Sequence, residues 1–215
     1  MQIAIFDVCD TIYRVNTTFS FLDYYLGNNK KYIFFRKITK LFPVKVFNYF
    51  FYKIFKKDLM RYFGTLFLKG KEIEEAQKYA HKFVYTDLVK EIKDSTVKMM
   101  SEYKSKGYKI VLMSGSYLFV IEEVAKYFNI DYFYASKLNI VDKLYTGKYE
   151  IDILLNKYDI LKREFKKFDK LVVVSNNKTD LELMKFADQS FAICNKEKDL
   201  KFWKPHFNIL CIKDY

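Results

Sequence analysis

The first thirteen residues, MQIAIFDVCDTIY (residues 1–13), decide the fold of this chain. Their apolar run Ile3–Phe6 has β-branched and aromatic residues without polar alternation, which is typical of a strand buried on both faces in a parallel sheet. Open α/β sheets bind ligands beyond the carboxyl ends of such strands. Asp7 and Thr11 therefore form a candidate phosphate or metal site, although an Asp followed by a Thr is also an ordinary helix start.

Composition limits the class of protein. The chain has 215 residues, 51% of them hydrophobic, which allows one core domain with a smaller insertion. Its 38 Lys and Arg against 26 Asp and Glu give a net charge of +12, which favours phosphorylated metabolites, nucleic acid or an acidic membrane as partners. Three widely spaced cysteines without a CxxC motif, and no cleavable signal, favour a reducing cytoplasm. No uninterrupted apolar stretch approaches the roughly 18 residues of a spanning helix.

Two kinds of pattern divide the chain. Residues 16–95 carry apolar residues at helical spacings between Gly and Pro, which predicts a helical insertion. Residues 1–15 and 96–215 alternate strands with helices, which implies a parallel sheet with right-handed crossovers. The strands expected after the first are Lys109–Met113, Asp131–Ala135, a hairpin of Leu138–Ile140 and Leu144–Tyr149, Lys170–Val174, Ser190–Ile193 and Asn208–Ile212.

Polar residues follow two further strands. Ser114 comes directly after the strand 109–113, and Asn176 and Asp180 come after the strand 170–174. Because the carboxyl ends of parallel strands share one edge of a sheet, we expect these clusters to converge with the first one. Lys157 lies at a helix start between the second and third clusters, from which its side chain can point to the same edge.

This series of motifs resembles the haloacid dehalogenase (HAD) superfamily of hydrolases, and within it the phosphoserine-phosphatase-like branch with a helical cap. The resemblance covers essentially the whole chain. The matching motifs are FDVCDT (residues 6–11), VLMSGS (residues 111–116), Lys157 in NKYDIL (residues 156–161) and SNNKTD (residues 175–180). The resemblance implies a Rossmann-like α/β core with a parallel sheet, residues 1–15 and 96–215, and an inserted all-helical cap, residues 16–95.

The resemblance also implies a reaction. Asp7 would be the nucleophile that attacks phosphorus and forms an aspartyl-phosphate, for which an ionised carboxylate is suited near neutral pH. Mg²⁺ would be held by hard oxygen ligands from Asp7, the backbone carbonyl of Cys9, Asn176 and Asp180.

The remaining motif residues would bind the phosphoryl group. Thr11, Ser114, Gly115 and Lys157 are the residues that the resemblance assigns to it. Lys157 would also be catalytic, because its charge offsets the negative charge of the transition state.

Two positions depart from the family pattern. Cys9 replaces the acid that normally protonates the leaving alcohol, a role worth about 10²–10⁴-fold in rate, or roughly 3–6 kcal/mol. The adjacent Asp10 is a candidate substitute acid. Asn176 replaces an aspartate and keeps a carbonyl oxygen for coordination, but it removes one negative charge, so Mg²⁺ should bind more weakly.

The expected function is therefore Mg²⁺-dependent hydrolysis of a phosphate monoester through Asp7, at a rate that Cys9 and Asn176 would lower. Two alternatives stay open. One is a catalytically degenerate binding or regulatory protein that keeps the fold. The other is a 2-haloacid dehalogenase-like hydrolase, because a halide leaving group needs no proton.

The helical insertion indicates which substrates and partners the protein could bind. Caps of this family close over the active site, so specificity for a small phosphorylated substrate is expected within residues 16–95. The stretch Tyr32–Lys57 mixes Phe and Tyr with Lys and Arg, either as a cap with an inward apolar face or as an interfacial surface for acidic lipid or a lipid-linked phosphate. Nucleic-acid binding is disfavoured because no RNA-binding motif is visible. We expect a cytoplasmic protein, with peripheral membrane contact left open and no indication of an oligomeric state.

Overall fold

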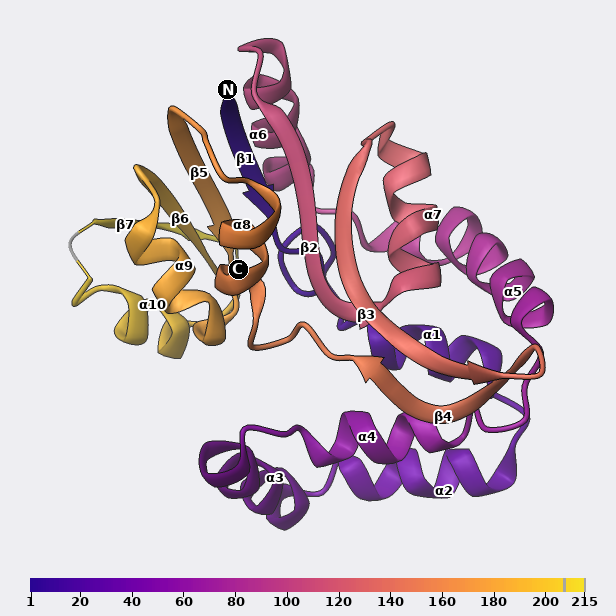
Figure 1. Ribbon diagram of the computed structural model, residues 1–215. Coiled ribbons are helices and arrows are strands. Elements are labelled where there is room, and N and C mark those ends of the chain that lie inside the picture. The colour runs from indigo at the N-terminus through magenta and orange to yellow at the C-terminus, as the bar shows by residue number, and fades with distance from the viewer. Residues whose placement is uncertain (207, 215) are drawn as a thin grey trace.

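The computed structural model describes residues 1–206 and 208–214 (Figure 1). The elements in its first half are β1 (Gln2–Phe6), α1 (Thr17–Tyr25), α2 (Lys30–Thr39), α3 (Phe42–Phe55), α4 (Leu59–Leu66), α5 (Ile73–Thr86), η1 (Leu88–Glu91) and α6 (Asp94–Ser105). The elements that follow are β2 (Lys109–Tyr117), α7 (Leu118–Phe128), β3 (Tyr132–Val141), β4 (Leu144–Ile151), α8 (Lys157–Glu164), β5 (Lys170–Ser175), η2 (Lys178–Asp180), α9 (Leu181–Phe186), β6 (Gln189–Cys194), α10 (Glu197–Trp203) and β7 (Ile209–Lys213).

A seven-stranded sheet forms the centre of the molecule, in the order β4-β3-β2-β1-β5-β6-β7. All neighbouring strands run parallel except β3 and β4, which are antiparallel. β1 lies between β2 and β5 (Figure 1). The carboxyl ends of these three strands therefore meet at one edge, as the sequence predicted.

The side chains of β1 alternate between the two faces of the sheet. Ala4 and Phe6 belong to the apolar cluster on one face, and Ile3 and Ile5 belong to the cluster on the other. All four are buried. Burial on both faces explains why this strand is a continuous apolar run rather than an alternating one.

Helices cover both faces (Figure 1). On one face α1, α5, α6 and α7 contribute apolar side chains to the first cluster, which include Phe21, Ala80, Met100 and Val124. On the other face α8, α9 and α10 contribute Leu161, Met184 and Trp203 to the second cluster.

Residues 16–95 are helical, as the spacing of apolar residues predicted. Helix starts follow from capping: the side chains of Asn16, Asn29 and Asp58 accept hydrogen bonds from backbone amides in the first turns of α1, α2 and α4. The division of residues 16–95 into a separate cap domain stays a prediction, because α1 and α5 share one apolar cluster with the sheet.

Several element boundaries differ from the prediction. β2 continues to Tyr117 instead of ending at Met113, with a register shift against β3 between Ser114 and Tyr117. Residues 132–141 form one strand, where two separate segments were expected. The short helices α9 and α10 were not predicted at all.

The chain that enters the helical segment pairs with the chain that leaves it, since Tyr13 and Ile92 form an antiparallel bridge and the Arg14 amide donates to the Glu91 carbonyl at 2.8 Å. The segment also contacts the sheet at β4, which lies beside α4 (Figure 1). There the Tyr145 amide donates to the Lys71 carbonyl at 2.9 Å. Within the described residues, no helix has the length and hydropathy to cross a membrane.

Candidate active site

The predicted site residues converge at the carboxyl edge of the sheet. Asp7 follows β1, Ser114 lies within β2, and Asp180 ends the short helix η2 after β5. The Asp7 amide donates to the Val174 carbonyl of β5 at 2.9 Å, which holds the turn after β1 against the end of β5.

Lys157, the first residue of α8, lies between two carboxylates. Its Nζ is 2.6 Å from Asp7 Oδ1 and 2.7 Å from Asp180 Oδ2, and all three side chains are buried. Ser175 Oγ donates to the same Asp180 oxygen at 2.7 Å. Residues 150 positions apart thus form one buried ionic cluster.

Thr11 joins the first motif to the fourth. Its Oγ1 lies 3.1 Å from Asp7 Oδ2 and 3.0 Å from Asn176 Oδ1, and it accepts a hydrogen bond from the Asn176 amide at 3.0 Å. Because a hydroxyl has one proton, it can donate to only one of the two oxygens at a time.

For both Asp7 and Lys157, burial and neighbouring opposite charges shift the pKa in opposite directions. Burial raises the pKa of Asp7 to about 6, and the nearby Lys157 only partly offsets it. Burial by itself would lower the pKa of Lys157, but the carboxylates of Asp180 and Asp7 outweigh it and raise the pKa above its usual value. Lys157 is therefore a permanent cation, whereas Asp7 is the group whose charge is costly.

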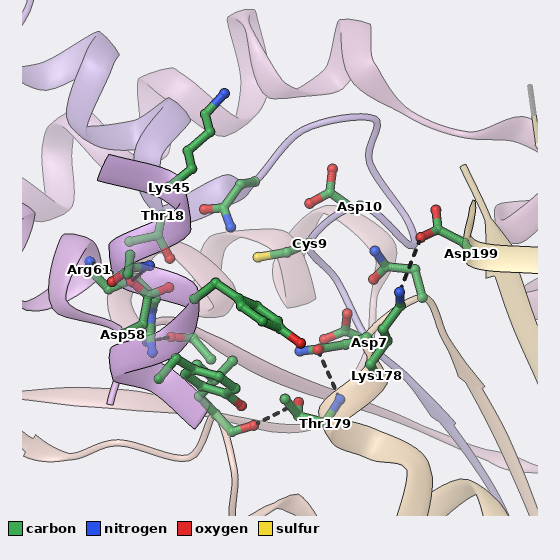
Figure 2. A pocket seen from close by; sticks show the side chains of 18 of the residues that line it. Asp7, Cys9, Asp10, Thr18, Lys45, Asp58, Arg61, Lys178, Thr179 and Asp199 are labelled. Atoms are coloured by element: carbon green, nitrogen blue, oxygen red, sulfur yellow. Dashed lines mark hydrogen bonds and ion pairs between the residues drawn. The ribbon is translucent and has the colours of Figure 1, made fainter. Parts of the chain in front are cut away.

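A cavity of about 520 Å³ opens beside this cluster (Figure 2). Asp7, Cys9, Asp10, Gly115 and Asn176 line it directly. The other predicted residues, Thr11, Ser114, Lys157 and Asp180, are buried behind this lining. Lys157 and Asp180 are joined to this lining through the ionic cluster with Asp7, and Thr11 through its contacts with Asp7 and Asn176.

The helical segment supplies the opposite wall of the cavity, which the sequence did not predict residue by residue. Figure 2 shows Asp58 and Arg61 on this side, across the cavity from Asp10 and Asp199. The lining residues from α3 are Lys45, Asn48, Tyr49 and Tyr52. Their spacing of three, four and seven residues marks one helix face and is the signal that could have found them.

The donor atoms suit Mg²⁺ in type. No group of three or more His, Cys, Asp or Glu side chains suited to a metal occurs among residues 1–206 and 208–214. The expected set instead combines carboxylates of Asp7 and Asp180 with the amide oxygen of Asn176 and the backbone carbonyl of Cys9. In the described part of the chain no group donates a hydrogen bond to that carbonyl, and all four donors are hard oxygens.

Cys9 stands where the family pattern has an acid. Its Sγ lies 2.7 Å from Thr17 Oγ1 and 3.7 Å from Ser114 Oγ. Burial and the neighbouring Asp7 raise the pKa of the Cys9 thiol, which makes it a weaker acid than an ordinary cysteine.

Asp10 has a left-handed backbone with φ of 54°. Its carbonyl accepts hydrogen bonds from Lys93 Nζ at 3.0 Å and Asn195 Nδ2 at 2.9 Å, which fix this turn. Burial raises the pKa of the Asp10 carboxyl, and Lys93 partly opposes the rise. The side chain lines the cavity, so its role as a substitute acid stays a prediction.

Tyr52 is a functional candidate that sequence reasoning missed. Its hydroxyl is buried and has no hydrogen-bond partner in the part of the chain that the structure describes. Burial, followed by the charges of Asp58 and Asp180, raises the pKa of Tyr52 to about 12, so the hydroxyl keeps its proton at neutral pH. The cavity thus contains an unused hydrogen-bond donor on the wall formed by the helical segment.

Arg61 of α4 connects this wall to the second motif. Its guanidinium pairs with Asp152 at 3.2 Å and also donates to the Gly115 carbonyl. Gly115 itself tolerates no side chain easily, because an added Cβ would lie 2.8 Å from the Leu154 side chain and 3.3 Å from its Cα. Close approach, rather than an unusual backbone angle, accounts for this glycine.

The fold and this edge define a class of protein: the chain belongs to the haloacid dehalogenase-like hydrolase family, whose sequence model matches residues 4–185. The predicted family and fold class are confirmed.

Among individual proteins the chain is similar to two phosphoserine phosphatases. It is 27% identical over 104 residues to that of Streptococcus thermophilus, covering 46% of this chain and 48% of the relative. It is 27% identical over 135 residues to that of Methanocaldococcus jannaschii, covering 60% of this chain and 61% of the relative. The chain thus spans about half to three-fifths of the length of these relatives.

A solved structure supports the fold. The structure of a phospho-aspartyl intermediate analogue of phosphoserine phosphatase has a TM-score of 0.64 with this chain at 19% identity, covering 98% of this chain and 92% of that one. At this identity the likeness extends to the fold alone.

Proposed function

We propose that this protein is a Mg²⁺-dependent phosphatase that hydrolyses a small phosphate monoester through an aspartyl-phosphate on Asp7. The observation that carries the proposal is the ionic cluster of Asp7, Lys157 and Asp180 beside a cavity at the carboxyl edge of the sheet. Membership of a hydrolase family and similarity to two phosphoserine phosphatases support the same reaction class.

In this proposal the Asp7 carboxylate attacks phosphorus, the bond from phosphorus to the leaving oxygen breaks, and water later hydrolyses the aspartyl-phosphate. Lys157 holds Asp7 in place and offsets the negative charge that develops. When held by Asp7, Asp180, Asn176 and the Cys9 carbonyl, Mg²⁺ supplies positive charge that reduces repulsion between the two anions.

The leaving oxygen needs a proton that Cys9 is poorly suited to give. Tyr52 is a candidate, because this residue lines the cavity from α3 and its hydroxyl has no hydrogen-bond partner among the described residues and keeps its proton. We therefore assign Tyr52 as the donor to the leaving oxygen. Asp10, the substitute acid suggested by the sequence, is the alternative donor in the same cavity.

A phosphorylated amino acid is the first substrate to test, because of the two relatives. Thr11, Ser114 and Gly115 stay the predicted residues of the phosphate cradle. Peripheral contact with an acidic membrane also stays a prediction.

Steady-state hydrolysis of an aryl phosphate in the presence of Mg²⁺ tests the proposal. We expect turnover by the unmodified protein, loss of turnover in Asp7→Asn, and a lower Mg²⁺ requirement in Asn176→Asp because it restores a negative charge. An unmodified protein no faster than Asp7→Asn would contradict the proposal.

Cys9 and Asn176 favour one rival, a degenerate protein that binds phosphate without turnover. That rival predicts activity only after Asn176→Asp. Halide release from a 2-haloacid, without phosphatase activity, would instead indicate a dehalogenase-like hydrolase.

A further inference from the structure

Helix α3 is unusual because none of its fourteen residues is buried. It lies at the end of the helical segment away from the sheet (Figure 1). Large apolar side chains are nevertheless frequent in it, and Phe47, Phe50 and Ile54 are 59%, 55% and 69% exposed. Further exposed apolar side chains nearby are Phe34, Leu41, Phe42 and Phe55.

The helix has two opposite faces. At about 100° per residue, the cavity-lining residues Lys45, Asn48, Tyr49 and Tyr52 centre on one direction. Phe47, Phe50 and Ile54 centre about 180° away from it. We call these three residues the outer face of α3. The cavity cannot account for them, because the other side of the helix supplies its lining.

The apolar area at this end of the molecule is large. Seven Phe, Leu and Ile side chains are each more than half exposed there. With ~150–250 Å² for a large apolar side chain, the three residues of the outer face expose on the order of 300–450 Å². The largest apolar patch on a monomeric protein has about this size and is often functional.

Positive charge is concentrated in the same stretch. Residues 30–57 contain nine Lys and Arg and no Asp or Glu. They carry nine of the twelve net positive charges, and the rest of the chain, with 29 basic and 26 acidic residues, carries three. Lys40, Lys53, Lys56 and Lys57 are all exposed.

We propose that the outer face of α3 binds the surface of an anionic lipid bilayer. Phenylalanine and isoleucine would enter the boundary between headgroups and acyl chains, and the flanking lysines would contact lipid phosphates. The proposal does not rest on phosphatase activity.

Charge favours a bilayer over a second copy of this chain. A symmetric contact through the outer face would bring two stretches with nine positive charges each against one another, which is unfavourable. An anionic lipid surface would satisfy both the apolar outer face and the positive charge of the surrounding stretch 30–57.

Flotation with vesicles tests the proposal. We expect the full chain to bind phosphatidylcholine vesicles that contain phosphatidylglycerol at least about tenfold more tightly than vesicles of phosphatidylcholine alone, and less tightly in high salt. The triple variant Phe47→Ser, Phe50→Ser, Ile54→Ser should weaken binding at least about tenfold.

A matched control changes three apolar residues elsewhere that are also more than half exposed, Val141→Ser, Ile151→Ser and Leu210→Ser, and should bind vesicles normally. Thermal melts check that both triple variants fold. Hydrolysis of a soluble aryl phosphate, measured separately, shows whether the proposed activity holds, so the two failures are distinguishable.

Three results would overturn the proposal. They are failure of the unmodified protein to bind the anionic vesicles, binding that the outer-face variant retains in full, and a dimer in sedimentation that the outer-face variant dissociates without any vesicle binding.

Discussion

Asp7 is a buried carboxylate whose ionised form is costly in the absence of a metal. Because its folded-state pKa of about 6 exceeds the ordinary 3.8, the folded protein binds this proton more tightly than the unfolded chain does. Its contribution to the free energy of unfolding is therefore fully present below about pH 4 and is lost as pH rises through about 6.

Urea unfolding in EDTA, compared between the unmodified protein and Asp7→Asn, isolates this effect. The unmodified protein should lose stability relative to the variant as pH rises from about 4 to 7. A difference that does not change with pH would show that Asp7 titrates as it does in an unfolded chain.

Tyr52 offers a second test at a single hydroxyl. If it donates to the leaving oxygen, Tyr52→Phe should lower kcat about 10- to 100-fold with an alkyl phosphate, and much less with an aryl phosphate, whose leaving group needs little protonation. Tyr49→Phe, in the same cavity wall, is the matched control. Equal losses with both esters would assign Tyr52 to packing instead.

These residues differ in how far the sequence reveals them. Asp7, Lys157 and Asp180 could be predicted to meet because strand ends of a parallel sheet share an edge. For Tyr52 the spacing of residues 45, 48, 49 and 52 marks one helix face, but not what that face meets. The position of α3 and α4 over the sheet, and with it the place of Tyr52 and Arg61, depends on tertiary packing and not on local pattern.

At the scale of elements, Arg61 and Asp152 join α4 to the segment after β4. Arg61 is buried, so Arg61→Met leaves Asp152 without its cationic partner and should cost roughly 3 kcal/mol in the free energy of unfolding. Urea unfolding of the unmodified protein and of Arg61→Met measures this difference in the free energy of unfolding.

The double variant Arg61→Met, Asp152→Asn provides the control. It should cost clearly less than the sum of the two single variants, because neither charge is then left alone. Strict additivity would mean that the ion pair does not couple the two elements.

Element types were predicted better than element ends. Residues 16–95 were predicted to be helical from their apolar spacing and contain α1 to α5. α9 and α10 have only six and seven residues, too few to show a period. β2 passes its predicted end because residues 114–117 are small or apolar and buried, so they remain in the sheet.

For the whole molecule, Mg²⁺ should act as a stabilising ligand if Asp7 and Asp180 hold it. A ligand at about 100 times its dissociation constant adds about 2.7 kcal/mol, or roughly 5–10 °C in Tm for a chain of this size. Thermal melts with MgCl₂, against NaCl of equal ionic strength, measure the shift.

EDTA should reverse the rise in Tm that MgCl₂ causes, and Asp180→Asn should strongly reduce that rise. An equal shift in Asp180→Asn would place Mg²⁺ elsewhere on the protein.

The pairing of β4 with the end of the helical segment has a consequence for recombination between relatives. An exchange that moves only residues 16–92 would separate Lys71 from Tyr145 and Arg61 from Asp152, although both junctions at Tyr13 and Ile92 were kept. A working chimera must inherit two stretches from the same parent, the helices and the hairpin of β3 and β4. In an exchange between relatives, these two stretches would therefore be expected to travel together.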